Sequence, residues 1–361
     1  MKKFVKFALG SFLALSLALA GCGSTGGDQA AQPQSGQQDG AAQEQAPAEK
    51  ITLDIGMLKL TSSAPLFIGI EKGFFAEEGI EANATWFDAA QPIAVATASG
   101  SVDVGATGIT ASLYNMVAGG QKLVIVADKG REQAGYSSSA LLFPSDSPLE
   151  SIEDLKGKKI GITQTGSTYH YMAGKLLEKH GLSLRDIELI PLNNIKGLME
   201  ALKSKQVDAV LLNEPNISRV VEEGYGKVVA QVGDEMEYQT SGIFFSPDLA
   251  ENKDAAERFL KAYIKSTRYY YDAVLNKVDG KIVPGENYDE VVNIIAKYTD
   301  QEPDMIKKGL PYIDRDGRLL DSDIKTQVDW YAKEKLIDKA IDTSEIVNTQ
   351  LLEDALQKLG K

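Results

Sequence analysis

The sequence predicts an α/β fold of two similarly built lobes, followed by a helical tail. Strand and helix patterns alternate from residue 51 to 127 and again from 159 to 232. This rhythm is typical of open, mostly parallel sheets that are covered by helices. The two series repeat the same order of elements, which indicates two lobes of one design. After residue 234 the pattern becomes mainly helical.

The first series begins with a strand over 51–58, where apolar and polar residues alternate. A helix follows over 65–75, because Leu66, Phe67 and Ile70 fall on one helical face. Further apolar runs predict strands over 80–87, 102–106 and 123–127, and helices over 91–99 and 109–118.

The second series predicts strands over 159–163, 187–192, 207–212 and 227–232, and helices over 168–179, 195–204 and 215–223. A local match supports the repeat, since a helix ends and the next strand begins at Val102-Asp103 in one series and at Val207-Asp208 in the other. The tail adds a short strand over 243–245 and helices over 255–275, 288–297, 303–308, 322–333 and 344–359.

The expected domain division follows from this order. Residues 51–142 together with 243–361 form lobe one, and residues 143–242 form lobe two. The chain crosses between the lobes near 140–143 and returns near 241–245. Two crossovers make a hinge, and the space between the lobes makes a cleft. A length of 361 residues agrees with two lobes, because it exceeds what one compact core usually holds.

The N-terminus reads as a lipoprotein signal peptide over residues 1–21. Three lysines precede an apolar stretch that is too short to span a bilayer, and the segment ends Leu19-Ala20-Gly21-Cys22, which resembles a bacterial lipobox. A lipid on Cys22 and a disordered tether over 22–50 would hold the folded part on the extracytoplasmic face of the cell membrane. A plain signal peptide with a coincidental cysteine is the alternative.

Composition and charge exclude several classes of function. A net charge of −13 argues against a nucleic-acid partner, because such a partner calls for a basic face. Cys22 is the only cysteine, which excludes internal disulfides and cysteine-rich metal sites. His170 and His180 are ten residues apart with no nearby cysteine, so no metal pair is expected. We expect no cofactor and no metal, and a monomeric protein.

The stretch from Leu155 to Gly181 carries the strongest functional signal. A short buried strand leads into a Gly/Ser/Thr turn, and a helix begins at Ser167 or Thr168, whose hydroxyl can cap it. The first turn of a helix offers unpaired N–H groups and partial positive charge, which suit an oxyanion. A turn that only connects the strand to a capped helix is an equally weighted alternative.

The other candidate ligand contacts lie mostly at the carboxyl ends of strands, where open α/β sheets bind ligands. The full set is Thr61, Ser62, Ser63, Trp86, Thr107, Thr110, Arg131, Tyr136, Thr165, Gly166, Ser167, Thr168, Tyr169, His170, Asn213 and Glu214. Arg131 could neutralise an anion, and Tyr169 with His170 could stack on a ring. The alternatives are helix capping for the hydroxyl residues and Glu214, a surface or capping role for His170, and a solvated loop charge for Arg131.

Several short motifs carry a resemblance to a known family. They are Glu71-Lys72-Gly73-Phe74-Phe75 with Glu78-Gly79-Ile80, Ser99-Gly100-Ser101-Val102-Asp103-Val104-Gly105, Asp154-Leu155-Lys156-Gly157-Lys158, Gly166-Ser167-Thr168, and Gln206-Val207-Asp208-Ala209 with Glu214-Pro215. With these motifs the chain resembles substrate-binding lipoproteins of bacterial ABC importers, in the nitrate/sulfonate/taurine and thiamine-precursor (NMT1/THI5-like) branch, over most of residues 51–275.

The resemblance implies a two-lobe periplasmic-binding-protein fold of type II-like topology that closes on one small molecule. It also implies partners, namely a membrane permease and a separate ATPase. The sequence has no Gly-x-x-x-x-Gly-Lys-Ser/Thr loop, so this chain is not expected to hydrolyse ATP.

The expected function is capture of a small organic anion, a sulfonate or carboxylate that can be aromatic, and its delivery to an ABC importer. The alternatives are a binding protein for a neutral heterocycle, such as a thiamine pyrimidine precursor or a flavin, and a sensor that presents its ligand to a receptor. An enzyme is not expected, because the related fungal synthases use a cysteine-rich motif that is absent from this sequence.

Overall fold

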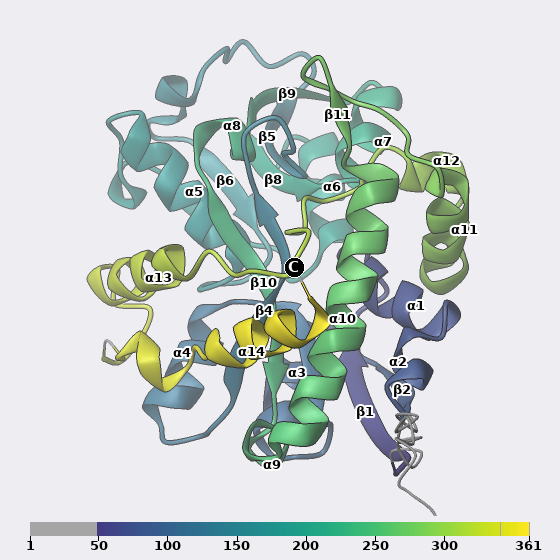
Figure 1. Ribbon diagram of the computed structural model, residues 1–361. Coiled ribbons are helices and arrows are strands. Elements are labelled where there is room, and N and C mark those ends of the chain that lie inside the picture. The colour runs from purple at the N-terminus through teal and green to yellow at the C-terminus, as the bar shows by residue number, and fades with distance from the viewer. Residues whose placement is uncertain (1–48, 340, 361) are drawn as a thin grey trace, which may run out of the picture. The chain divides into compact units, whose positions relative to one another are not determined.

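Figure 1 shows a computed structural model of the chain, which describes residues 49–339 and 341–360. The predicted signal peptide, Cys22 and all but the last two residues of the predicted tether lie outside the described residues. In the part that is described, no helix is both long and apolar enough to cross a membrane.

The first sheet has five strands in the order β2-β1-β3-β10-β4. Their bounds are β1 Ile51–Met57, β2 Ile80–Trp86, β3 Val104–Gly108, β4 Val124–Glu132 and β10 Tyr238–Phe245. Strand β10 is antiparallel to both β3 and β4, whereas β1 is parallel to β2 and β3. The sheet is therefore mixed, because one strand enters it from far along the chain.

The second sheet has the matching order β7-β6-β8-β5-β9. Its strands are β5 Ser139–Pro144, β6 Lys159–Ile162, β7 Glu188–Pro191, β8 Ala209–Asn213 and β9 Gly226–Gln231. Here β5 is the inserted antiparallel strand. In both sheets the other four strands run in one direction, so the sheets are mostly parallel as expected, but the inserted strand β5 was not predicted. Every residue of β5 is buried, and such an unbroken apolar run shows no alternation by which a strand is recognised.

The helices of the first lobe are α1 Ala64–Glu71, α2 Phe74–Glu77, α3 Ala90–Ala98 and α4 Ala111–Ala118. Those of the second lobe are α5 Thr168–Lys179, α6 Ile195–Lys203, α7 Asn216–Glu222 and α8 Val232–Glu235. The single helix expected over 65–75 is divided in two at Gly73, whose φ of 76° lies in the left-handed region that favours glycine.

The repeat between the lobes extends to individual hydrogen bonds. In the first lobe a carboxylate oxygen of Asp103 accepts from the backbone N–H of Asp54 at 2.8 Å. In the second lobe Asp208 accepts from the N–H of Lys159 at the same distance. Each aspartate thus ties the turn before one strand to the neighbouring strand of its sheet, which accounts for the paired Val-Asp motifs.

The chain passes between the sheets at residues 133–138 and 232–237, several residues before the expected crossings, which fall inside β5 and β10. Hydrogen bonds connect the two passages to each other. The N–H of Gly135 donates to Asp234 at 3.0 Å, and the N–H of Gly233 donates to the Ser137 hydroxyl at 2.8 Å. Buried Glu132 accepts hydrogen bonds from Ser137, Ser138 and Ser139, which fixes the start of the first passage.

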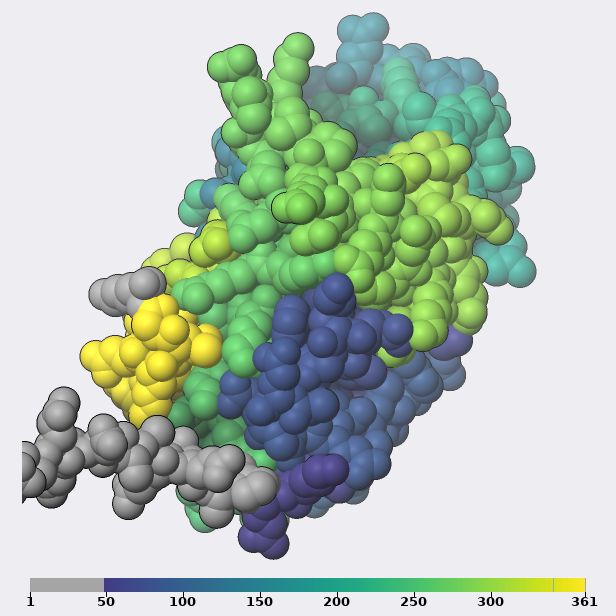
Figure 2. All heavy atoms as spheres, turned by 45° about the vertical axis from the view of Figure 1, so that its right-hand side comes forward, coloured from purple at the N-terminus to yellow at the C-terminus, as the bar shows by residue number. Residues whose placement is uncertain are grey.

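The tail contains α9 Pro247–Glu251, α10 Lys253–Val274, α11 Tyr288–Thr299, α12 Pro303–Ile306, α13 Asp321–Lys333 and α14 Gln350–Leu359. Helices α10, α11 and α14 share one hydrophobic core with the first sheet and α1. A hairpin of β11 Lys277–Val278 and β12 Lys281–Ile282 stands out from the surface at the top of Figure 2.

Helix α13 contacts both lobes. Its Trp330 and Tyr331 belong to a second hydrophobic core, which also contains residues of α4 and of the second sheet. Trp330 lies edge-on to His170 of α5, with the ring centroids 5.9 Å apart, and a Cβ added at Gly174 would lie 2.1 Å from its ring. On the side of the molecule where α13 packs, the two lobes are therefore joined by a continuous apolar cluster.

Candidate functional site

The N-terminus of α5 lies against the strand ends of the first lobe. The N–H of Ala111, the first residue of α4, donates to the carbonyl of Gly166 at 3.1 Å. A Cβ added at Gly108, the last residue of β3, would lie 3.5 Å from Cγ2 of Thr168. The predicted turn and the predicted strand ends thus meet, although they are about sixty residues apart in the sequence.

The local sequence explains the turn. Gly166 has a φ of 77°, and a Cβ there would lie only 2.8 Å from Cβ of Ala111. Ser167 is the N-cap of α5, because its hydroxyl accepts from the N–H of His170 at 3.2 Å. Thr168 follows as the first helical residue. The capping alternative is therefore realised at Ser167, and Thr168 is left next to the first lobe.

His170 fixes the turn from inside the protein. Its Nδ1 accepts from the N–H of Gly166 at 3.0 Å, and burial lowers the pKa of the imidazole to about 4, so the ring is neutral near pH 7. Its Nε2 has no hydrogen-bond partner among the residues that the structure describes. Tyr169 is also buried, and its hydroxyl donates to Asn213 at 2.8 Å.

A set of first-lobe residues completes what we call the interlobe site, defined as Ser62, Gly108, Lys129, Gly130 and Thr240 together with Gly166 and Thr168. A Cβ added at Gly130 would lie 3.7 Å from Cβ of Ser62 and 3.8 Å from the Thr240 hydroxyl. A Cβ added at Gly108 would lie 3.7 Å from the carbonyl oxygen of Thr240. The site therefore brings together hydroxyl side chains and glycines, whose lack of a side chain lets the neighbouring residues approach closely.

Lys129 was not singled out from the sequence, which favoured Arg131 in the same segment. Its ammonium donates to the Ser62 hydroxyl at 2.7 Å, and the residue is only 2 % exposed. Burial lowers the pKa of this ammonium to about 7, and the nearby Asp128 carboxylate opposes the shift. The signal that could have found it is a charged residue in the middle of a strand that is otherwise buried.

Thr107, in β3, is another predicted residue that is buried. It is 1 % exposed, and its hydroxyl has no partner among the described residues. Of the other predicted hydroxyl residues, Thr61 and Ser63 are buried in the short turn Thr61–Ser63, Thr110 caps α4 and Thr165 is exposed.

Other predicted residues are engaged elsewhere. Arg131 lies 3.5 Å from Asp314 and stacks on Tyr312, and the Tyr136 hydroxyl donates to the carbonyl of Leu275. Trp86 is 40 % exposed and packs with Phe67 and Tyr298. Glu214 accepts from the N–H and hydroxyl of Ser218 and so caps α7, and burial raises the pKa of its carboxyl.

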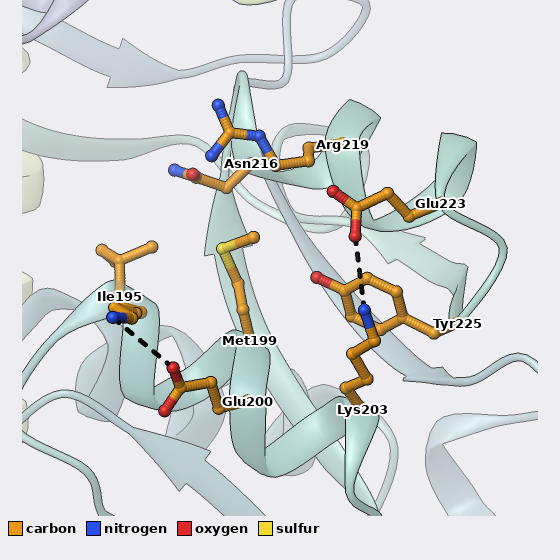
Figure 3. A pocket seen from close by; sticks show the side chains of 9 residues that line it. Ile195, Met199, Glu200, Lys203, Asn216, Arg219, Glu223 and Tyr225 are labelled. Atoms are coloured by element: carbon orange, nitrogen blue, oxygen red, sulfur yellow. Dashed lines mark ion pairs between the residues drawn. The ribbon is translucent and has the colours of Figure 1, made fainter.

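A separate hollow of about 500 Å³ lies on the second lobe between α6 and α7 (Figure 3). Met199 lies at its centre, and the ion pairs Lys196–Glu200 and Lys203–Glu223 lie at its sides. None of the predicted site residues lines it. Among the described residues, no cluster of three or more His, Cys, Asp or Glu side chains is arranged to hold a metal ion.

A comparison with protein families decides the relationship. The model described as NMT1/THI5 like matches residues 60–273, which is more than half of the chain. The chain belongs to the NMT1/THI5-like family.

Individual relatives of this NMT1/THI5-like protein are similar to it over most of its length. A Bacillus subtilis protein with the provisional name aliphatic sulfonates-binding protein is 24% identical over 307 residues, which covers 82% of this chain and 86% of the relative.

Among solved structures, the alkanesulfonate-binding protein SsuA of Xanthomonas axonopodis bound to MOPS aligns with a TM-score of 0.65 at 20% identity, covering 84% of this chain and 99% of that one. The desulfurization enzyme DszB aligns with a TM-score of 0.62 at 15% identity, covering 86% and 99% of the two chains. These likenesses confirm the two-lobe periplasmic-binding-protein fold, and they show that it also carries an enzyme.

The contact at Gly166 generates a prediction for this NMT1/THI5-like protein. Gly166→Ala places a methyl group against Ala111 as well as straining the backbone, and overpacking of this kind typically costs about 1–3 kcal/mol. Gly181→Ala is the matched control, because Gly181 has a φ of 74° but nothing within 4 Å of an added Cβ. Denaturant unfolding should therefore show a larger loss of stability for Gly166→Ala. Equal losses would mean that the turn and α4 are apart in the unliganded protein.

Proposed function

We propose that this protein is an extracytoplasmic solute-binding lipoprotein, which captures a small organic anion between its two lobes and delivers it to an ABC importer. The observation that carries the proposal is the position of the α5 N-terminus against the strand ends of the first lobe. The unpaired N–H groups of a helix start and its partial positive charge favour an oxyanion such as a sulfonate or a carboxylate.

The names of the relatives support the same class of solute. One relative is named for aliphatic sulfonates, and a structural neighbour is an alkanesulfonate-binding protein that holds MOPS, itself a sulfonate. The proposal includes binding without chemical turnover and delivery to a permease that works with a separate ATPase. It also includes monomeric action and attachment to the extracytoplasmic face of the membrane through lipid on Cys22.

Capture requires the lobes to part and close again. The Ala111–Gly166 hydrogen bond joins the lobes directly, so it must break to admit a solute into the interlobe site. The two braced passages at 133–138 and 232–237 and the apolar cluster at α13 provide the connection about which such a motion turns. We propose that the solute stabilises the closed arrangement, which the permease then recognises.

The Thr168 hydroxyl provides the first test. Thr168→Val keeps the shape of the side chain and removes the hydroxyl, and a hydrogen bond to a charged group is worth about 1.5–3 kcal/mol. Affinity for a bound sulfonate or carboxylate should fall roughly tenfold to a hundredfold in calorimetric titrations, since about 1.4 kcal/mol is a factor of ten.

Ser167→Ala is the companion variant, because it removes a helix cap and should lower the free energy of unfolding by about 0.5–2 kcal/mol. If Thr168→Val binds as tightly as the unaltered protein, the helix N-terminus does not hold the solute.

The lipid anchor has its own test. Cys22→Ala removes the thiol to which lipid would be attached, so the protein should appear in the soluble fraction of cells instead of the membrane fraction. Mass spectrometry of the mature N-terminus should find a lipidated Cys22 in the unaltered protein. An unmodified N-terminus at another residue would contradict the anchor and leave solute binding untouched.

A further inference from the structure

Lys129 occupies an irregular position in β4. Asp128 pairs with Gly242 of β10, and Gly130 pairs with Ser241, so Lys129 is an extra residue without a partner in the ladder. Thr240 is an extra residue on the facing strand, between Gln239 and Ser241. Such bulges bend a strand and redirect side chains, and they are frequent beside functional sites. The bulge points Lys129 to Ser62, while Asp128 is bonded to the N–H groups of Gly130 and Asp314.

The surroundings of Lys129 leave its ammonium without a direct ion-pair partner among the described residues. An ammonium has three donors, and among the described residues this one donates only to a neutral hydroxyl, that of Ser62. No ion pair among the described residues includes Lys129, whereas Arg131 is paired with Asp314. The Asp128 carboxylate favours the charged form of Lys129, but it also accepts a hydrogen bond from the Gln239 amide. A buried cation without a counterion destabilises a fold, so its presence calls for a reason outside the fold.

Arg131 shows the contrasting case two residues later. It is paired with Asp314 and stacked on Tyr312, so its charge is balanced inside the protein. Lys129 has instead the Ser62 hydroxyl beside it, and Ser62 lies next to Gly130 and Thr240. The positive end of α5 and Lys129 therefore belong to one region, which Gly108, Thr240 and Gly130 connect, and each favours a negative, hydrogen-bond-accepting group.

We propose that Lys129 is the cationic group that binds the solute, and that the solute is therefore an anion and not a neutral heterocycle. This inference rests on the proposed function and decides between two classes of solute that the sequence leaves open. Ser62 accepts from Lys129 and retains its own O–H donor for the same anion. The anion completes the coordination of the ammonium and balances its charge when the lobes close.

The test compares Lys129→Met with Lys203→Met in the full chain. The substitution is the same in both, but Lys203 is an exposed residue of the hollow between α6 and α7. Calorimetric titrations use propane-1-sulfonate, butanoate and nitrate as anionic probes, and propane-1-sulfonamide and 4-amino-2-methylpyrimidine as neutral probes. We expect an anion to bind the unaltered protein, Lys129→Met to weaken this binding by about a hundredfold or more, and Lys203→Met to leave it unchanged.

Thermal unfolding separates a binding role from a structural one. The pKa of Lys129 is lower in the folded protein than in the unfolded chain, so the unfolded chain binds more protons between about pH 7 and pH 10, and the free energy of unfolding rises with pH across that range. Below that range the buried charge reduces stability. Lys129→Met should therefore unfold at an equal or higher temperature than the unaltered protein at pH 7 without ligand. A marked fall would show that Lys129 serves the fold.

Each remaining outcome is decisive. Equal anion affinity with and without Lys129 overturns the inference and leaves solute binding intact. A neutral probe that binds as tightly as its anionic counterpart also overturns the inference and leaves solute binding intact. Loss of binding in Lys203→Met moves the site to the α6–α7 hollow. If no probe binds at millimolar concentration, both the inference and the proposed function are contradicted for these classes of solute.

Discussion

One hydrogen bond, from the N–H of Ala111 to the carbonyl of Gly166, places the two lobes in register at the interlobe site. It forms only because residue 166 has no side chain, since a Cβ there would collide with Ala111. The same contact sets the positive end of α5 beside β3 and beside the region of Ser62 and Lys129. The chemistry attributed to this protein depends on that approach, because neither lobe alone presents both the helix start and the ammonium.

The two lobes are joined differently at this contact and on the far side of it. Behind it, α13 and the aromatic residues around Trp330 join the lobes through continuous apolar packing, and the passages at 133–138 and 232–237 are hydrogen-bonded to each other. At the contact itself the lobes touch through the Ala111–Gly166 hydrogen bond and small side chains, and the ion pair Lys308–Glu222 and the approach of Gly309 to Glu214 also join the tail to the second lobe. Strong packing on one side and a weak, polar contact on the other suit a molecule that opens at the polar side.

Much of the fold follows from the sequence, because alternating patterns and turn residues are local signals. Helix α5 begins at Thr168 and ends at Lys179, as predicted, since its cap at Ser167 and Gly181 beyond its end lie within a few residues of it. Strand β5 and the extent of β10 were missed, because their pairing partners lie far along the chain. In the candidate site, Ser62, Gly166 and Thr168 were predicted from the positions of strand ends and helix starts. Lys129 was not, because the strand predicted over 123–127 ended before it, and the bulge that turns its side chain to Ser62 is set by the pairing of two strands that are distant in the sequence.

The most direct measurement is the hydrogen exchange rate of the Ala111 amide, with and without a bound anion. This amide bonds across the lobes to Gly166, whereas the amide of Leu113 bonds within the first lobe to Thr110 and serves as an internal reference. If the solute closes the lobes, exchange at Ala111 slows when the anion is added, and exchange at Leu113 changes little. Equal rates at Ala111 in both states, with the anion demonstrably bound, would contradict the account.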